Sequence, residues 1–210
     1  MKGYVEEGNA NAVFKCSDSK KNIFLIGDSI RMGYCKYTKT ELADTAEVFY
    51  PDDNCRHSHY VISTLRGWSE MFDYKSKVDV VQFNFGHWDA AHWYGYEEPL
   101  TDEKTYAKNI KMTVWLIKQL FPNAKIVFAT TTPVNPNGIH GINPRTNGEI
   151  ENLNNIARSL ANECGYEIND LYEFTKDWKE DMFADYCHFT DSSNEILGKQ
   201  VADYLRNLVK

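Results

Sequence analysis

The stretch that decides the fold is residues 22–31, which read NIFLIGDSIR. Its apolar part, residues 23–26, is short and is stopped by Gly27, a pattern typical of a buried strand in a parallel sheet. Residues 30–43 then follow a helical pattern. The chain therefore passes from strand to helix through Gly27-Asp28-Ser29, and in sheets of this kind the site lies at the carboxyl ends of the strands.

The alternation of strand and helix continues to the C-terminus. Short apolar runs predict strands at 46–50, 78–83, 124–129 and 166–168. Apolar residues at helical spacing predict helices at 58–73, 102–121, 148–163 and 191–208, and Thr101 is placed to cap the second of these. This order favours an α/β fold, with a mostly parallel sheet and helices on both faces. We expect residues 1–20 to form an N-terminal arm and residues 21–210 a single domain.

Composition narrows the classes of function. The 210 residues are 42% hydrophobic, which suits one compact core. The formal net charge of −7 argues against nucleic acid or an anionic membrane as the main partner. The five scattered cysteines suggest free thiols in a reducing compartment. With neither a signal-peptide core nor an apolar run of spanning length, we expect a cytoplasmic protein, or a secreted one if a signal peptide was removed.

Ser29 is the candidate nucleophile. A serine in the first turn of a helix can direct its hydroxyl into the cleft at the sheet edge. Its own N–H is one of the free donors of the helix N-terminus, so the same residue can stabilise a developing negative charge. The alternative is that Asp28 or Ser29 only caps the helix.

Asp185 and His188 are the candidate acid and base. They lie three residues apart, just before the last predicted helix, and side chains at that spacing can share one face of a turn. The carboxylate can then hold one imidazole nitrogen while the other faces a serine hydroxyl. Cys187, between them, is expected to be a packed small side chain. Alone, the motif could also be a capping loop with an incidental histidine.

These two motifs together resemble the GDSL/SGNH hydrolases, from Asn22 to the C-terminus. The resemblance implies a flavodoxin-like three-layer α/β/α sandwich with a central, mostly parallel five-stranded sheet. It also implies ester hydrolysis through a Ser29, His188 and Asp185 triad, with no cofactor and no metal.

The sequence departs from the family pattern at the oxyanion hole. The family has a glycine after the second strand and Gly-x-Asn-Asp after the third. Here residues 52–58 contain no glycine, Gly67 is expected inside a helix, and residues 86–89 read GHWD, with Trp88 in the asparagine position. The Ser29 N–H is expected to keep its role. The other candidate donors are the side-chain N–H groups of Asn54, which we prefer, and of Asn84 and Trp88, or a backbone N–H near Cys55 and Arg56.

An aromatic and polar rim surrounds the expected site. Residues 87–96, HWDAAHWYGY, are a candidate platform for sugar rings, and the loop 131–147 can supply hydroxyl-binding groups. The same aromatic residues could instead pack a long loop onto the body. The loop candidates are Asn135, Asn137, His140 and Arg145. The candidate substrate-binding residues are Asp28, His57, His87, Asp89, Trp93 and Asn135.

Other functions remain as alternatives. His57, His59, His87, Asp89 and His92 could suggest a metal site, but no HExxH pattern or cysteine pair accompanies them, and we expect none. The leading hypothesis is a serine esterase acting on small acyl groups, acetyl first, of a carbohydrate. The alternatives are a thioesterase or lysophospholipase on the same triad, a non-catalytic carbohydrate-binding protein, and a phosphate- or nucleotide-binding domain, which the lack of a Gly-rich loop disfavours.

Overall fold

Five parallel strands form the central sheet of the computed structural model, which describes residues 8–138 and 141–210. The strands are β1 (Lys21–Ile26), β2 (Ala46–Phe49), β3 (Val80–Phe83), β4 (Lys125–Ala129) and β5 (Glu167–Asn169). Their order across the sheet is β2-β1-β3-β4-β5. The predicted α/β/α sandwich around a five-stranded parallel sheet is confirmed.

Six α-helices connect and follow the strands in the described part of the chain. They are α1 (Ser29–Glu41), α2 (Ser58–Ser69), α3 (Glu103–Leu120), α4 (Asn147–Cys164), α5 (Leu171–Thr175) and α6 (Asp191–Leu208). Three short 3₁₀ helices lie at Lys75–Lys77, Trp93–Gly95 and Glu180–Met182. Among these described helices, none has the length and apolarity needed to cross a bilayer.

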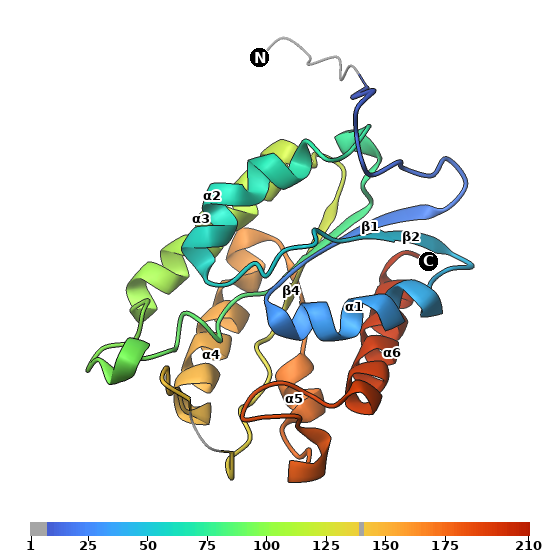
Figure 1. Ribbon diagram of the computed structural model, residues 1–210. Coiled ribbons are helices and arrows are strands. Elements are labelled where there is room, and N and C mark those ends of the chain that lie inside the picture. Colours follow the sequence, from blue (N-terminus) through green and yellow to red (C-terminus); the bar gives the residue numbers. More distant parts are fainter. Residues whose placement is uncertain (1–7, 139–140) are drawn as a thin grey trace.

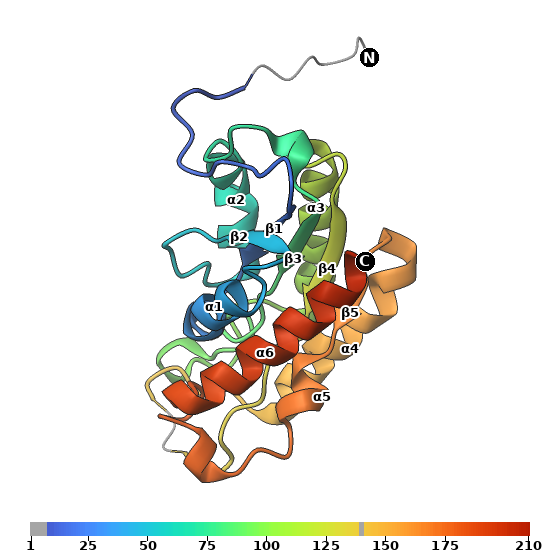
Figure 2. The ribbon, with the colours of Figure 1, turned by 90° about the vertical axis from the view of Figure 1, so that its right-hand side faces the viewer.

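The helices cover the sheet in two layers. Helices α2, α3 and α4 lie on one side and α1 and α6 on the other, as the two views show (Figures 1 and 2). The strands serve both layers because successive side chains point to opposite faces. In β1, Phe24 and Ile26 pack toward α2 and α3, whereas Ile23 and Leu25 pack toward α1 and α6. This double burial is why the strands appear in the sequence as continuous apolar runs.

The predicted elements agree with the observed ones to within a few residues, with one wrong cap and one missed helix. Asp102, and not Thr101, caps α3, because its carboxylate accepts hydrogen bonds from the Thr105 N–H and hydroxyl. Thr101, which precedes the capping residue, is buried, and its N–H donates to Asp89 O. Helix α5 has only five residues, too few for a periodic signal. Gly67 does lie inside α2, as expected.

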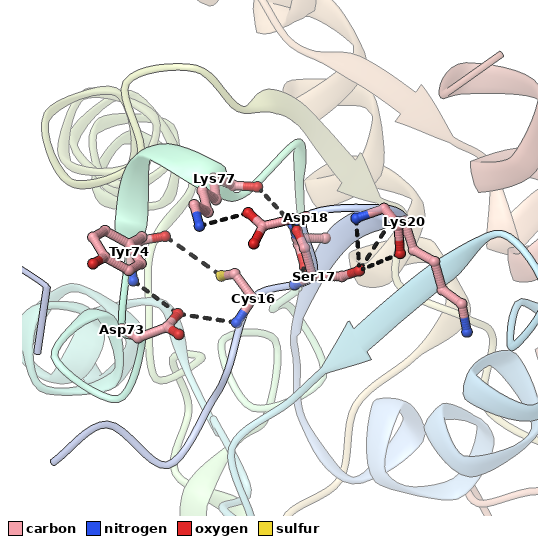
Figure 3. Close-up of polar contacts among 9 residues, drawn as sticks. Cys16, Ser17, Asp18, Lys20, Asp73, Tyr74 and Lys77 are labelled. Carbon is pink, nitrogen blue, oxygen red and sulfur yellow. Dashed lines mark hydrogen bonds and ion pairs between the residues drawn. The ribbon is translucent and has the colours of Figure 1, made fainter. Parts of the chain in front are cut away.

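The described part of the N-terminal arm, residues 8–20, is attached to the segment that joins α2 to β3. Figure 3 shows the polar contacts: the Asp73 carboxylate accepts from the Cys16 N–H at 2.9 Å, and Lys77 pairs with Asp18 at 2.7 Å. Phe14 forms a single parallel bridge with Phe72 and packs on the aromatic core. The arm therefore covers the edge of the core at the end opposite Ser29.

Candidate active site

Ser29 lies at the junction between β1 and α1, as the sequence predicts. Gly27 makes this turn possible, since a Cβ on it would lie 2.7 Å from the Cβ of Arg31. Asp28 then caps α1, its side chain accepting from the Ile30 N–H at 3.0 Å. Ser29 is the first residue of the helix, so its N–H has no carbonyl one turn back to bind. The capping role thus belongs to Asp28, and the serine is left at the sheet edge.

A short hairpin-like loop before α6 carries Asp185 and His188. Phe183 and Phe189 form an antiparallel bridge at its base, and the Ala184 N–H donates to His188 O at 2.8 Å. One oxygen of Asp185 accepts from the backbone N–H groups of Cys187 and His188 at 2.8 and 2.7 Å. This arrangement holds the carboxylate and the imidazole on the same side of the loop.

The three predicted triad side chains form one hydrogen-bonded chain. His188 Nδ1 lies 2.7 Å from Asp185 Oδ2, and His188 Nε2 lies 2.8 Å from Ser29 Oγ. Both distances are within the range expected between a nucleophile, its base and the group that orients the base. The sequence motifs 159 residues apart are thus brought into direct contact.

The environment of the histidine favours its charged form. Hydrogen bonding with the Cys187 side chain, and then with Asp185, raises the pKa of His188 to about 9, against the opposing effect of burial. For Asp185, partial burial raises the pKa, but the hydrogen bonds from His188 and Cys187 outweigh it and leave the pKa below its ordinary value. In the resting protein at neutral pH the pair is therefore an imidazolium beside a carboxylate.

A cavity of about 190 Å³ opens beside Ser29. A wider groove of about 440 Å³ adjoins it, and Trp88 and Trp93 contribute to the walls of both. The two indole rings lie 5.4 Å apart between centroids. The cavity is lined by Ser29, Asn54, Trp88, Ala91, Trp93, Asn143, Arg145, Tyr186, Cys187 and His188.

Asn54 is well placed among the expected oxyanion donors. Its Oδ1 accepts from the Arg56 N–H at 3.0 Å, which orients the amide, and the residue lines the cavity with Ser29. The backbone N–H of Cys55 is not free, since it donates to Gly27 O at 3.2 Å. Trp88 also lines the cavity. The structure thus brings Asn54 and Trp88 beside Ser29.

Asn84 lies elsewhere. Its amide donates to Ala129 O at 2.8 Å and so ties the end of β3 to β4. His87 is buried next to it, with Nε2 3.2 Å from the Thr132 hydroxyl. Burial holds the pKa of His87 well below its ordinary value. Neither residue lines the cavity beside Ser29, so the structure gives both a role inside the sheet edge rather than at the substrate.

Three further candidates for substrate binding have structural partners instead. Asp28 is fully buried as the α1 cap. Asp89 is also fully buried and accepts from the backbone N–H and the hydroxyl of Ser58, the first residue of α2. Asn135 is 5% exposed; its backbone N–H donates to Tyr186 O at 2.7 Å and joins the loop 131–147 to the triad loop.

His57 and Trp93 do face open space. His57 caps α2 through Nδ1 and also lines the wider groove, together with Trp88 and Trp93. Its pKa is lowered, chiefly by burial. His140, one of the loop candidates, lies outside the described residues. Of the six predicted substrate-binding residues, these two therefore lie at the site.

Several residues that line the cavity were not predicted from the sequence. Ala91, Asn143 and Tyr186 line the cavity, and Cys187 lies with its thiol 3.7 Å from His188 Nδ1. Tyr186 and Cys187 could have been found from their place inside Asp-x-x-His. In the described residues, the one group with metal-ligand geometry is Asp185, Cys187 and His188, with ligand atoms within 4.8 Å. It contains none of the residues of the metal cluster considered from the sequence.

Comparisons with known proteins identify the family and the fold. The sequence model described as the GDSL-like lipase/acylhydrolase family matches residues 25–196. A search of curated proteins found no match. Among solved structures, the chain is similar to a lipase/acylhydrolase from Enterococcus faecalis, with 19% identity, TM-score 0.66, and coverage of 89% of this chain and 96% of that one.

Two further similar structures belong to an acetyl xylan esterase and a carbohydrate acetylesterase. An acetyl xylan esterase has 19% identity, TM-score 0.68, and coverage of 88% of this chain and 99% of that one. A carbohydrate acetylesterase from Sinorhizobium meliloti has 16% identity, TM-score 0.68, and coverage of 90% and 100%. At such identities the likeness extends to the fold alone.

Proposed function

Since the chain belongs to the GDSL-like lipase/acylhydrolase family, we propose that it is a serine esterase that removes small acyl groups, acetyl first, from a carbohydrate. The family makes it an ester-hydrolysing enzyme, and Ser29, His188 and Asp185 are the proposed triad. The observation that carries this assignment is the continuous contact Ser29 Oγ to His188 Nε2 at 2.8 Å and His188 Nδ1 to Asp185 Oδ2 at 2.7 Å.

In the acylation step Ser29 Oγ attacks the ester carbonyl carbon. Neutral His188 takes the hydroxyl proton at Nε2 as the bond forms, and Asp185 stabilises the resulting imidazolium. The negative charge moves to the former carbonyl oxygen, where the Ser29 N–H and the Asn54 amide are the donors. The tetrahedral intermediate collapses, the ester C–O bond breaks, and His188 returns the proton to the departing alcohol.

In the deacylation step the same groups act on water. His188, neutral again, accepts a proton from a water molecule as it attacks the acyl carbon. The second tetrahedral intermediate then collapses, Ser29 leaves with the proton from His188, and the carboxylic acid is released. Over the two steps one ester and one water molecule are consumed, one alcohol and one carboxylic acid are released, and Ser29 and His188 return to their starting states.

The shape of the site supports a short acyl group. A cavity of about 190 Å³ beside Ser29 suits an acetyl group with part of its alcohol, and not a long aliphatic chain. The adjoining groove, with Trp88 and Trp93 in its wall, offers aromatic surface of the kind that sugar rings stack on. These features favour a carbohydrate ester over the thioesters and lysophospholipids of the alternative.

Labelling tests the nucleophile directly. A fluorophosphonate probe is expected to modify the wild type at Ser29, identified by mass spectrometry of the labelled peptide, and to leave Ser29→Ala unmodified. Ser63→Ala is the matched control, because Ser63 is an exposed helix serine away from the cavity and its loss should leave labelling unchanged. A folded wild type that is not labelled at Ser29 would refute the proposed chemistry.

A substrate panel tests the specificity. Activity on p-nitrophenyl esters is expected to fall as the acyl chain lengthens from acetate, and acetylated sugars should be better substrates than acyl-CoA. Preference for long chains or for thioesters would contradict the carbohydrate assignment while leaving the triad in place.

A further inference from the structure

Arg145 is a buried cation at the wall of the triad cavity. It is 7% exposed, yet a guanidinium carries five N–H donors, and the structure gives this one a single hydrogen bond, from Nη2 to Cys187 Sγ at 3.4 Å. Its Nε is buried without any acceptor among the described residues. Sulfur is a weak acceptor, so most of the hydrogen-bonding capacity of Arg145 is unused.

Arg145 also makes no close ion pair with the described residues, although its charge opposes the rise in pKa that burial causes at the Asp28 carboxyl. Of the ion pairs within 4.0 Å in residues 8–138 and 141–210, none includes it, whereas Arg158 and Arg206 each pair with an aspartate. The ring of Tyr186, with its centroid 4.9 Å from the guanidinium carbon, offers a cation–π contact. A buried charge and its hydrogen-bond donors normally have partners, because removing them from water is costly.

The backbone around Arg145 is held firmly on both sides. Pro144 O accepts from the His92 N–H at 2.8 Å. Thr146 caps α4 in a capping box with Glu149, both partners donating and accepting. The guanidinium is therefore presented from a fixed loop, which is how a recognition group is preorganised.

Arg145 lies close to the reacting groups. It shares the cavity lining with Ser29, and it touches the Cys187 sulfur, which is 3.7 Å from the imidazole of His188. A ligand that fills this cavity of about 190 Å³ would meet both the hydroxyl of Ser29 and the unused donors of Arg145.

We propose that Arg145 binds a carboxylate of the substrate, so that this enzyme acts on esters of acidic molecules, with the carboxylate a few bonds from the ester. The proposal rests on the esterase function above. A guanidinium matches a carboxylate in a bidentate, planar arrangement, and the pair supplies both charge and acceptors. The carboxylate can belong to the alcohol, as in an acetylated sugar acid, or to the acyl group, as in a hemisuccinate.

Matched substrate pairs test the proposal and separate these two sources. One pair is O-acetylated galacturonate against O-acetylated galactose, and the other is p-nitrophenyl hemisuccinate against p-nitrophenyl butyrate. In one pair, wild-type kcat/KM is expected to favour the acidic member by roughly 10- to 100-fold. Arg145→Gln should abolish that ratio, and Arg145→Lys should retain part of it. Arg66→Gln, which removes an exposed arginine of α2, should keep the wild-type ratio.

A binding measurement keeps the test independent of catalysis. Ser29→Ala is titrated calorimetrically with galacturonate, succinate, galactose and galactose 6-phosphate, and the titrations are repeated with Ser29→Ala/Arg145→Gln. Binding of a carboxylate ligand that the second substitution weakens at least 10-fold supports the proposal, whether or not the wild type hydrolyses esters. Equal ratios for acidic and neutral substrates with no carboxylate binding would overturn it, even if p-nitrophenyl acetate is cleaved. Preference for the phosphate would overturn the carboxylate assignment.

Discussion

The Cys187 thiol is expected to set the pH at which His188 becomes a base. Its sulfur lies 3.7 Å from His188 Nδ1, and hydrogen bonding with this side chain is the largest influence that raises the pKa of His188 to about 9. A general base acts only when neutral. We therefore expect kcat/KM of the wild type to rise with pH up to about 9. The substitution Cys187→Ala should shift the midpoint of this rise to lower pH.

The size of the effect follows from the neutral fraction. With a pKa of about 9, roughly 1% of the imidazole is neutral at pH 7, whereas at an unperturbed pKa of about 6.5 the fraction is roughly three quarters. Asp185 remains in Cys187→Ala and still raises the pKa, at 2.7 Å from Nδ1. The midpoint should therefore fall by about one unit or more without reaching 6.5, and activity at pH 7 should rise about tenfold or more.

The assay is the initial rate on p-nitrophenyl acetate from pH 5.5 to 10, corrected for spontaneous hydrolysis and fitted for the acid limb of kcat/KM. Cys35→Ala is the matched control, since Cys35 is also a buried thiol but lies in α1 against the other face of the sheet. Its profile should superimpose on that of the wild type. The reasoning is refuted if the wild type and Cys187→Ala share the same midpoint.

Three further results follow from the site. Asn54→Ala should lower kcat on p-nitrophenyl acetate by roughly 10²–10³-fold, whereas Asn84→Ala should lower the melting temperature and affect kcat less; the reverse ranking would identify Asn84 as the donor. Asp89→Ala should reduce the free energy of unfolding in urea by about 2 kcal/mol or more, because it leaves the buried donors of Ser58 without an acceptor. The stability that the raised pKa of His188 provides should be full below pH 6.5 and be lost as the pH rises through about 9, so His188→Gln should flatten that part of the unfolding curve.

The architecture was predictable because it depends on local patterns. The run 23–26 is apolar at every position, as a strand covered on both faces must be, and Phe24 and Leu25 do pack into opposite layers. Helix α3 buries Ile110, Val114 and Ile117 at helical spacing, as the pattern predicts. The error at its cap is small but instructive, because Thr101 and Asp102 are both good caps, and only the burial of Thr101 decides between them.

The polar candidates were less predictable, because a polar residue after a strand can face either the cleft or the protein. Asn84, Asp89 and Asn135 all occur in segments at the carboxyl edge of the sheet. Each is buried on a partner far away in sequence: Ala129 for Asn84, Ser58 for Asp89 and Tyr186 for the backbone of Asn135. Composition and spacing do not reveal these partners. The position of each residue in the sequence therefore predicted the correct edge of the sheet, but not whether its side chain faces the cleft or the protein interior.

Arg145 is the reverse case, since its significance comes from the partners it lacks. In the sequence it is one polar residue of a loop rich in Pro, Asn and Gly, and a solvated arginine there needs no explanation. It becomes informative once the loop folds against the triad loop, through Asn135 and Tyr186, and buries the guanidinium beside Cys187. A buried guanidinium whose donors lack acceptors destabilises the free protein, whereas a bound carboxylate would supply those acceptors and offset that cost. Its position at the cavity wall is therefore most simply explained by a substrate that brings the opposite charge.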